Sequence, residues 1–422
     1  MIETPLTPPA APPEPEPVGS TLRLLGATPH RAWFLLGLTS ALASMLWWSA
    51  FWGAALYAPT ALVMPPVAPA HVHGLLMSHG LMGFFIFGFL TTVFPRWQDR
   101  PPVPRGAWLP AVLVSAAGYA LVLVGALTSR TVLLAGAVGL AVGHLLASAP
   151  LLRVYLQAGA SRVLHARVAL LALGVGALDL LAFAWGVATQ DAGLLSAAVD
   201  VAVRGYLLLL FATVGHRMIP FFSRRLLPDY TQRRPAWPLA GVALGAAAQL
   251  ALGWAGMRAW AWVPALLAAG SALWLSVLWK PWRCRSPRLL GSLHLGFAWL
   301  PLAMGLYAAQ SAWEAWGGQL LMARGPLHAL TIGFYGTLLV AMVSRVSLGH
   351  SGRALRMGGL TWALLLGVQL VAVVRLAGEL PLAGLASHAN LGAAGLWLVV
   401  MGIWAAIYGP MLWRPRVDGR PG

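Results

Sequence analysis

The sequence predicts an all-α fold, a polytopic membrane helix bundle of about twelve transmembrane helices with both termini in the cytoplasm. Of the 422 residues, 59% are hydrophobic and only 9% are charged, whereas a soluble domain carries roughly 25% charged residues. The apolar runs have the length of about 20 residues that a helix needs to cross a bilayer core of ~30 Å. Arginines lie between these runs, which is the pattern that orients membrane helices.

Twelve apolar runs follow one another along the chain, separated by clusters of Pro, Gly and Arg. Backbone polar groups in lipid must be satisfied within their own segment, so each run is predicted to be a helix. The predicted helices cover residues 32–58, 73–94, 107–127, 131–150, 168–188, 199–220, 237–256, 260–279, 289–312, 325–344, 358–377 and 389–411. They form a single domain over residues 32–412, between a disordered Pro-rich cytoplasmic tail (1–31) and a short basic cytoplasmic tail (413–422).

The distribution of Lys and Arg predicts the orientation. With the N-terminus inside, 23 of the 28 basic residues fall on the cytoplasmic side, and only Arg130, Arg258, Arg324 and Arg375 fall in the outer loops. This bias is the positive-inside rule. The net charge of +17 therefore orients the chain in a lipid bilayer and does not indicate nucleic acid binding, which would need a basic domain. The single cysteine, Cys284, excludes an intramolecular disulfide and a Cys-ligated iron–sulfur cluster.

Histidines gather near the outer ends of three predicted helices. His71, His73 and His79 lie in the second helix, His328 begins the tenth, and His388 begins the twelfth. Imidazole in lipid is costly, so an intramembrane histidine predicts a function, although histidines at an interface also occur without one. Because His79 and His328 lie inside their helices, we expect them to ligate a cofactor, with His73, His388 and His71 available to a second metal.

The spacing within the second helix permits a haem. At 100° per residue His73 and Met77 share a face, and Gly83 lies one turn below His79. A glycine there would give a planar macrocycle room, and haem iron takes axial His or Met ligands. His and Met also suit copper. The alternative is that the glycines only aid helix packing.

Other polar residues also fall within the predicted helices. Asp179 in the middle of the fifth helix needs a proton or a partner, which leaves a proton relay and a satisfied core acid equally open. Asp200 and Arg204 are four residues apart and are predicted to form an intrahelical ion pair. His294, near the inner end of the ninth helix, and His216 and His350 at the inner surface either form a separate site or line that surface.

Several stretches together resemble the NnrS family of membrane proteins. The resemblance runs from residue 32 onward and rests on the histidines that begin the second helix and on the ranges Gly88–Trp97, Arg217–Arg224, His294–Trp299, His328–Gly333 and Ser344–Arg353. It implies a multi-pass protein of the bacterial cytoplasmic membrane that contains haem b and copper and takes part in the response to nitric oxide. It leaves open whether the protein binds nitric oxide, turns it over, or handles iron that nitric oxide has damaged.

The second helix departs from the family pattern. The family commonly has His-x-His-Glu-Met, whereas this chain reads His71-Val72-His73-Gly74-Leu75. The Glu and Met are absent, so the resemblance does not fix which histidine of this helix has the family role.

Three other hypotheses remain beside the resemblance. A haem–copper oxidase also has twelve helices, but the seventh helix here lacks the histidines of its oxygen-reducing centre. A transporter of a small solute or metal would use Asp179 and the glycine-rich helices, although no pair of broken helices marks two halves. A scaffold without a site would not explain five histidines biased toward one face.

Overall fold

The computed structural model describes residues 18–319, 322–380 and 384–419, with side chains from residue 21 onward. Every element within these ranges is helical, and twelve helical spans are long and apolar enough to cross a membrane. The predicted all-α fold and the predicted number of spans are therefore confirmed. The part of the predicted tail up to residue 17 lies outside the described residues. Within the rest of the predicted tail (1–31), Val18–Leu25 forms the short helix α1.

Nine of the twelve spans of the described chain consist of one long helix each or of one long helix with short turns. They are spans 1 (α2, Pro29–Tyr57), 3 (α5, Arg105–Leu127), 4 (α6, Arg130–Gln157), 5 (α7, Leu164–Thr189), 7 (α10, Ala236–Trp254), 8 (Arg258–Arg283, which contains α11, Trp262–Leu278), 9 (α12, Arg288–Ala315), 11 (α15, Gly359–Ala377) and 12 (α16, Leu385–Tyr408, and α17, Pro410–Trp413).

Spans 2, 6 and 10 each contain a π-helical segment. Span 2 is α3 (Pro69–Leu75), η2 (Leu76–Met82) and α4 (Gly83–Trp97); span 6 is α8 (Ala192–Val201), η4 (Ala202–Leu207) and α9 (Leu208–Leu226); span 10 is α13 (Gly325–His328), η7 (Ala329–Gly336) and α14 (Thr337–His350). The three π segments begin about 126 residues apart. π-helical segments are rare in proteins overall, and those that do occur often lie at functional sites. Because a π turn is wider than an α turn, the period of 100° per residue used in the sequence analysis does not hold across span 2.

Spans 2 and 10 lie deepest in the bundle. The apolar stretch of span 2 is 83% buried and that of span 10 is 72% buried, against 33% for span 8. The segment η2 packs on η4, and the hydroxyl of Tyr335 in η7 donates to the carbonyl oxygen of Val203 in η4 at 2.8 Å. The π segment η4 therefore contacts both of the others.

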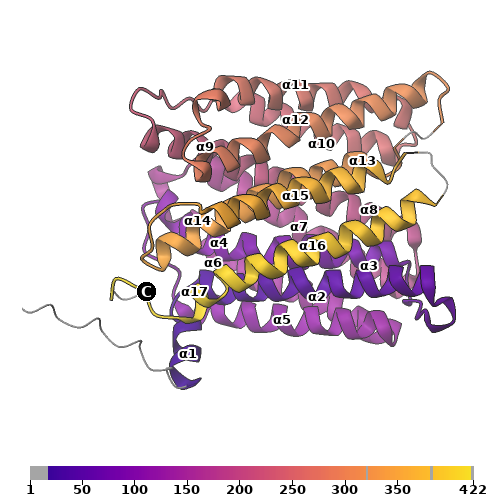
Figure 1. Ribbon diagram of the computed structural model, residues 1–422, viewed down its shortest axis with the longest axis horizontal. Coiled ribbons are helices and arrows are strands. Elements are labelled where there is room, and N and C mark those ends of the chain that lie inside the picture. Colours follow the sequence, from indigo (N-terminus) through magenta and orange to yellow (C-terminus); the bar gives the residue numbers. More distant parts are fainter. Residues whose placement is uncertain (1–17, 320–321, 381–383, 420–422) are drawn as a thin grey trace, which may run out of the picture.

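The two ends of the chain pack together. Figure 1 shows α16 running beside α2, and the indole Nε1 of Trp397 donates to the carbonyl oxygen of Ala41 across this contact at 3.2 Å. The guanidinium of the buried Arg31 donates to the carbonyl oxygens of Leu412 and Arg414 at 2.9 and 3.0 Å. The last helix therefore closes the bundle against the first.

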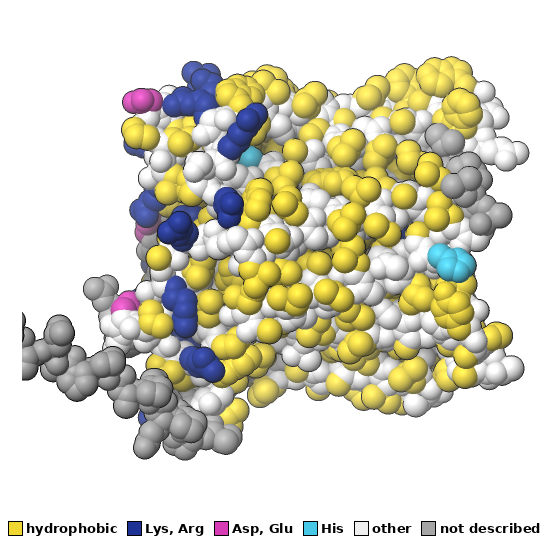
Figure 2. Space-filling model, in the orientation of Figure 1, with side chains coloured by type: hydrophobic (Ala, Val, Ile, Leu, Met, Phe, Trp, Pro, Cys, Tyr) yellow, Lys and Arg dark blue, Asp and Glu magenta, His cyan; other side chains and the backbone are white. Residues whose placement is uncertain are grey.

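Charged side chains gather at one end of the bundle. Figure 2 shows Lys and Arg at the end where the C-terminus lies, and a largely uncharged band along the helices. We call this the basic end and its opposite the far end. Large apolar side chains along the helices, such as Leu113, Leu178 and Val399, are at least half exposed. An exposed apolar band of this kind fits a bilayer.

Candidate functional site

A histidine and an aspartate meet in the buried interior between spans 2 and 5. The Nε2 atom of His79, in η2, lies 2.7 Å from Oδ1 of Asp179, in α7. Both residues are almost fully buried. Asp179 therefore has the partner that its position in the membrane requires.

Two further side chains complete what we call the buried polar cluster: His79, His144, Asp179 and Tyr206. The ring of Tyr206, in η4, stacks on that of His79 with centroids 5.0 Å apart and an interplanar angle of 4°. The ring of His144, in α6, lies 5.8 Å from that of His79. His144 donates from Nε2 to the carbonyl oxygen of Leu173 at 2.8 Å. Four spans thus contribute to one polar cluster. The sequence analysis did not assign His144 or Tyr206 to a site.

Apart from the two atoms of the His79–Asp179 contact, three buried polar atoms in this cluster have no hydrogen-bond partner among the described residues. They are Nδ1 of His79, Oδ2 of Asp179 and the hydroxyl of Tyr206. Buried polar groups are nearly always paired with protein or with ordered water. The cluster therefore has the capacity to hold water or another polar molecule. The glycine expected to give a macrocycle room is Gly83, where a Cβ would lie 3.5 Å from the Tyr206 hydroxyl, so Tyr206 occupies that side of the helix.

A second group, the far-end histidine pair, consists of His73 in span 2 and His328 in span 10. His73 and His328 lie within electrostatic range of one another. The ring of His73 stacks on that of Trp48 with centroids 4.2 Å apart, and its Nδ1 is buried without a partner among the described residues. His328 donates from Nδ1 to the carbonyl oxygen of Arg324 at 2.8 Å. This hydrogen bond leaves Nε2 of His328 as an acceptor, the form in which histidine ligates a metal.

Positive charge borders this pair. His73 and His328 both lie within electrostatic range of Arg324 and Arg375. Arg375 forms an ion pair with Glu379 at 2.5 Å, and Glu379 accepts from the backbone N–H of Arg324 at 3.1 Å. Glu379 thus contacts the guanidinium of Arg375 and the backbone of Arg324, and no ion pair of the Arg324 guanidinium is seen within the described ranges.

The structure does not bring together the three histidines expected to hold a second metal. His71 contacts the hydroxyl of Ser196 at 2.9 Å, whereas the exposed His388 donates to the carbonyl oxygen of Gly384 at 2.9 Å. His73 belongs to the far-end histidine pair. Within the described part of the chain, no three His, Cys, Asp or Glu side chains are placed to hold a metal ion. The predicted intrahelical pair of Asp200 and Arg204 is confirmed at 3.0 Å.

Histidines at the basic end also pair, and the sequence analysis left their role open. His216 donates from Nε2 to the carbonyl oxygen of Pro235 at 2.8 Å, so its Nδ1 accepts from Nε2 of His165 at 2.9 Å. The rings of His30 and His350 lie with centroids 4.2 Å apart.

His294 lies in a separate contact at this end, where its Nε2 donates to the Ser223 hydroxyl at 3.2 Å. The thiol of Cys284 reaches the same hydroxyl at 3.8 Å. Burial raises the pKa of the Cys284 thiol, and burial also raises the pKa of the neighbouring Tyr230 to about 12. The Cys284 thiol and the Tyr230 hydroxyl are therefore neutral at physiological pH and act as packing and hydrogen-bonding groups.

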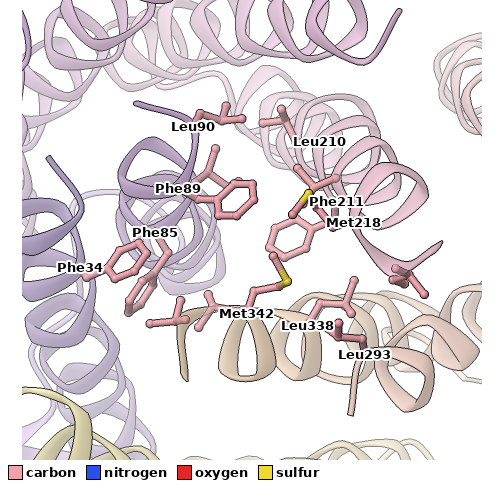
Figure 3. A pocket seen from close by; sticks show the side chains of 16 residues that line it. Phe34, Phe85, Phe89, Leu90, Leu210, Phe211, Met218, Leu293, Leu338 and Met342 are labelled. Carbon is pink, nitrogen blue, oxygen red and sulfur yellow. The ribbon is translucent and has the colours of Figure 1, made fainter. Parts of the chain in front are cut away.

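An apolar cavity of about 60 Å³ lies between spans 1, 2, 6, 9 and 10. Figure 3 shows the rings of Phe85, Phe89 and Phe211 and the side chains of Met218 and Met342 around it. All of its lining residues are apolar or glycine. An apolar cavity stays dry and binds small apolar molecules.

A twelve-span helical bundle with an apolar outer band and buried histidines defines the class: a polytopic integral membrane protein. The NnrS protein family matches residues 25–416, nearly the whole chain. The chain belongs to the NnrS family. No curated protein matches it.

Proposed function

We propose that the protein is a haem-binding membrane protein of the nitric oxide response, in which His73 and His328 hold the haem. The observation that carries the proposal is the far-end histidine pair, with one histidine from each of the two most buried spans. Family membership supports haem, which the NnrS family is associated with.

The residues present fit the group. The Nδ1 of His73 is a buried atom without a partner among the described residues, and Nε2 of His328 is left free by the bond of Nδ1 to Arg324. Two nitrogen ligands from different helices are what a haem iron takes in a bis-histidine site. Arg324 and Arg375 would neutralise the carboxylates of the haem edge.

The proposed ligands differ from the pair expected from the sequence, because His79 contacts Asp179 and not His328. The buried polar cluster is then a separate feature on the other side of span 2. The copper that the family implies does not fit the three histidines expected for it, since His71, His73 and His388 contact different neighbours.

The chain's own residues prepare this site in two ways. Trp48 stacks on His73 and fixes its ring, and the Arg324 carbonyl fixes the tautomer of His328. When bound, haem would supply electron transfer, and it would take a diatomic ligand only where that ligand displaces His73 or His328. Nitric oxide is uncharged and enters lipid, and the apolar cavity of Figure 3 is a further place within the bundle that suits such a molecule.

Absorption spectra of purified protein expressed with ample haem test the proposal. We expect a Soret band in the wild type that is lost in both His73→Ala and His328→Ala. The matched control is His388→Ala, since His388 is exposed at the same end, and it should keep the band. A band that survives in His73→Ala and is lost in His79→Ala would instead favour the ligand expected from the sequence. A wild type without a Soret band rejects haem binding.

We also propose that the basic end faces the cytoplasm. The bias of 23 basic residues against four supports this orientation, and the bundle gathers the basic residues at one end. A green fluorescent protein fused after Val417 should fluoresce, and alkaline phosphatase fused at the same place should be inactive. The reverse result would invert the bundle.

A further inference from the structure

A large hollow opens at the far end of the bundle. Its volume is about 760 Å³, and it is lined by residues of spans 6 to 10 and of the start of span 2. Three arginines line it: Arg204 from η4, Arg258 at the start of span 8, and Arg324 just before span 10. We call it the arginine vestibule.

Arginines at this end of the bundle are unusual, because most basic residues of the chain lie at the opposite end. Only four basic residues fall in the far-end loops, and two of the four, Arg258 and Arg324, line the vestibule. Neither forms an ion pair within the described ranges. Basic residues at the end that the positive-inside rule depletes, gathered around one hollow, indicate a function for their charge.

Arg204 is the deepest of the three. One guanidinium nitrogen lies 3.0 Å from Asp200, and the guanidinium lies over the ring of Tyr307 at 5.4 Å. Its Nε is buried without a partner in the described structure. The hydroxyl of Tyr335 donates to the carbonyl oxygen of Val203 at 2.8 Å, which ties down the π segment that carries Arg204. A guanidinium has five N–H donors, so most of those of Arg204 are not used by Asp200.

Acidic residues do not cancel this charge. Asp200 and Glu314 line the vestibule, and Glu314 accepts from Gln310 at 2.8 Å. Three guanidinium groups face two carboxylates, one of which is already in an ion pair. We propose that the arginine vestibule binds a small anion with a carboxylate or oxyanion group, held by Arg204, Arg258 and Arg324. Planar guanidinium groups suit such groups because they donate two parallel hydrogen bonds.

Calorimetric titration of the purified protein with sodium nitrate, acetate and phosphate at constant ionic strength tests this proposal. We expect saturable binding of at least one of them, weakened about tenfold or more in Arg204→Gln and in Arg324→Gln. Arg258→Gln changes an exposed residue and leaves the ion pair of Asp200 and Arg204 intact, and it should also weaken binding. The matched control is Arg130→Gln, a far-end arginine outside the vestibule, which should bind as the wild type does.

Asp200→Asn gives a test of opposite sign. It removes the carboxylate that competes for Arg204, so binding should tighten severalfold. Equal weakening in Arg130→Gln, weaker binding in Asp200→Asn, or no saturable heat with any of the three anions would overturn the proposal. Binding seen only with vesicles of anionic lipid would overturn it as well, since a lipid surface would then be the ligand. The proposal does not rest on haem, and its test is made on haem-free protein.

Discussion

Nε2 of His79 and Oδ1 of Asp179 lie 2.7 Å apart in the buried interior, although 100 residues separate them in the chain. This contact fastens span 2 to span 5 at a place where both side chains are almost fully buried. A polar contact in such a place is costly to break, because each partner left behind stays buried.

Asp179→Asn should therefore destabilise the protein by about 1–3 kcal/mol, measured by unfolding in SDS. The amide has the shape of the carboxyl but replaces one acceptor oxygen by an NH2 donor, so it forms a weaker contact with Nε2 of His79. The control is Asp200→Asn, which breaks a partly exposed pair and should cost about 0–1 kcal/mol. Equal losses of stability in the two variants would contradict the inference that the buried His79–Asp179 contact stabilises the protein more than the partly exposed pair does.

Gly118→Ala should push α5 and α6 apart. A Cβ at Gly118 would lie 2.6 Å from the backbone nitrogen of Leu140 and 2.7 Å from the backbone carbon of Gly139. Backbone atoms cannot turn aside as a flexible side chain can, so we expect a loss of about 1–3 kcal/mol in the same unfolding assay.

Its control is Gly174→Ala in α7, where no atom lies within 4 Å of the new Cβ. This change should be neutral or should stabilise the helix by about 0.5–1 kcal/mol. A similar loss in both variants would show that the close approach of α5 and α6 does not govern the result.

Xenon should bind in the apolar cavity of Figure 3, and the ¹²⁹Xe resonance should shift on binding. Val214→Phe places a ring in that space and should abolish binding. Val399→Phe adds the same ring to an exposed position and should leave binding unchanged. Retention of the signal in Val214→Phe would mean that xenon occupies another place.

Cys284 should react slowly with N-ethylmaleimide in the folded protein. The thiol is fully buried, and burial raises its pKa. The thiolate is the reactive form, so at pH 7 the folded protein holds less of it than an unfolded chain does. The rate, followed by mass spectrometry, should rise with pH toward the raised pKa and should increase sharply at pH 7 after unfolding in SDS. Rapid labelling of the folded protein at pH 7 would be inconsistent with this burial.

Local sequence patterns predicted the fold and the contacts within one helix. Apolar length and arginine placement were enough to count the spans, and the spacing of four residues was enough to pair Asp200 with Arg204. Both follow from the regular geometry of a single helix.

Contacts between spans were beyond the reach of such patterns. The partner of Asp179 is on another helix, and periodicity gives no neighbour across 100 residues. The sequence also placed His73 and His79 by a uniform period, but η2 lies between α3 and α4. The separate surroundings of these two histidines therefore became visible only with the helices in place.

The π segment of span 2 holds about one residue more per turn than the α-helices on either side of it. Deletion of one residue from Leu76–Met82 could therefore let the segment tighten into an ordinary helix while α3 and α4 keep nearly the same faces toward their neighbours. A deletion of the same size within the regular helix α4 would instead turn the two parts of the helix by about 100° relative to one another. Among the positions of span 2, this short stretch should therefore tolerate a change of chain length best.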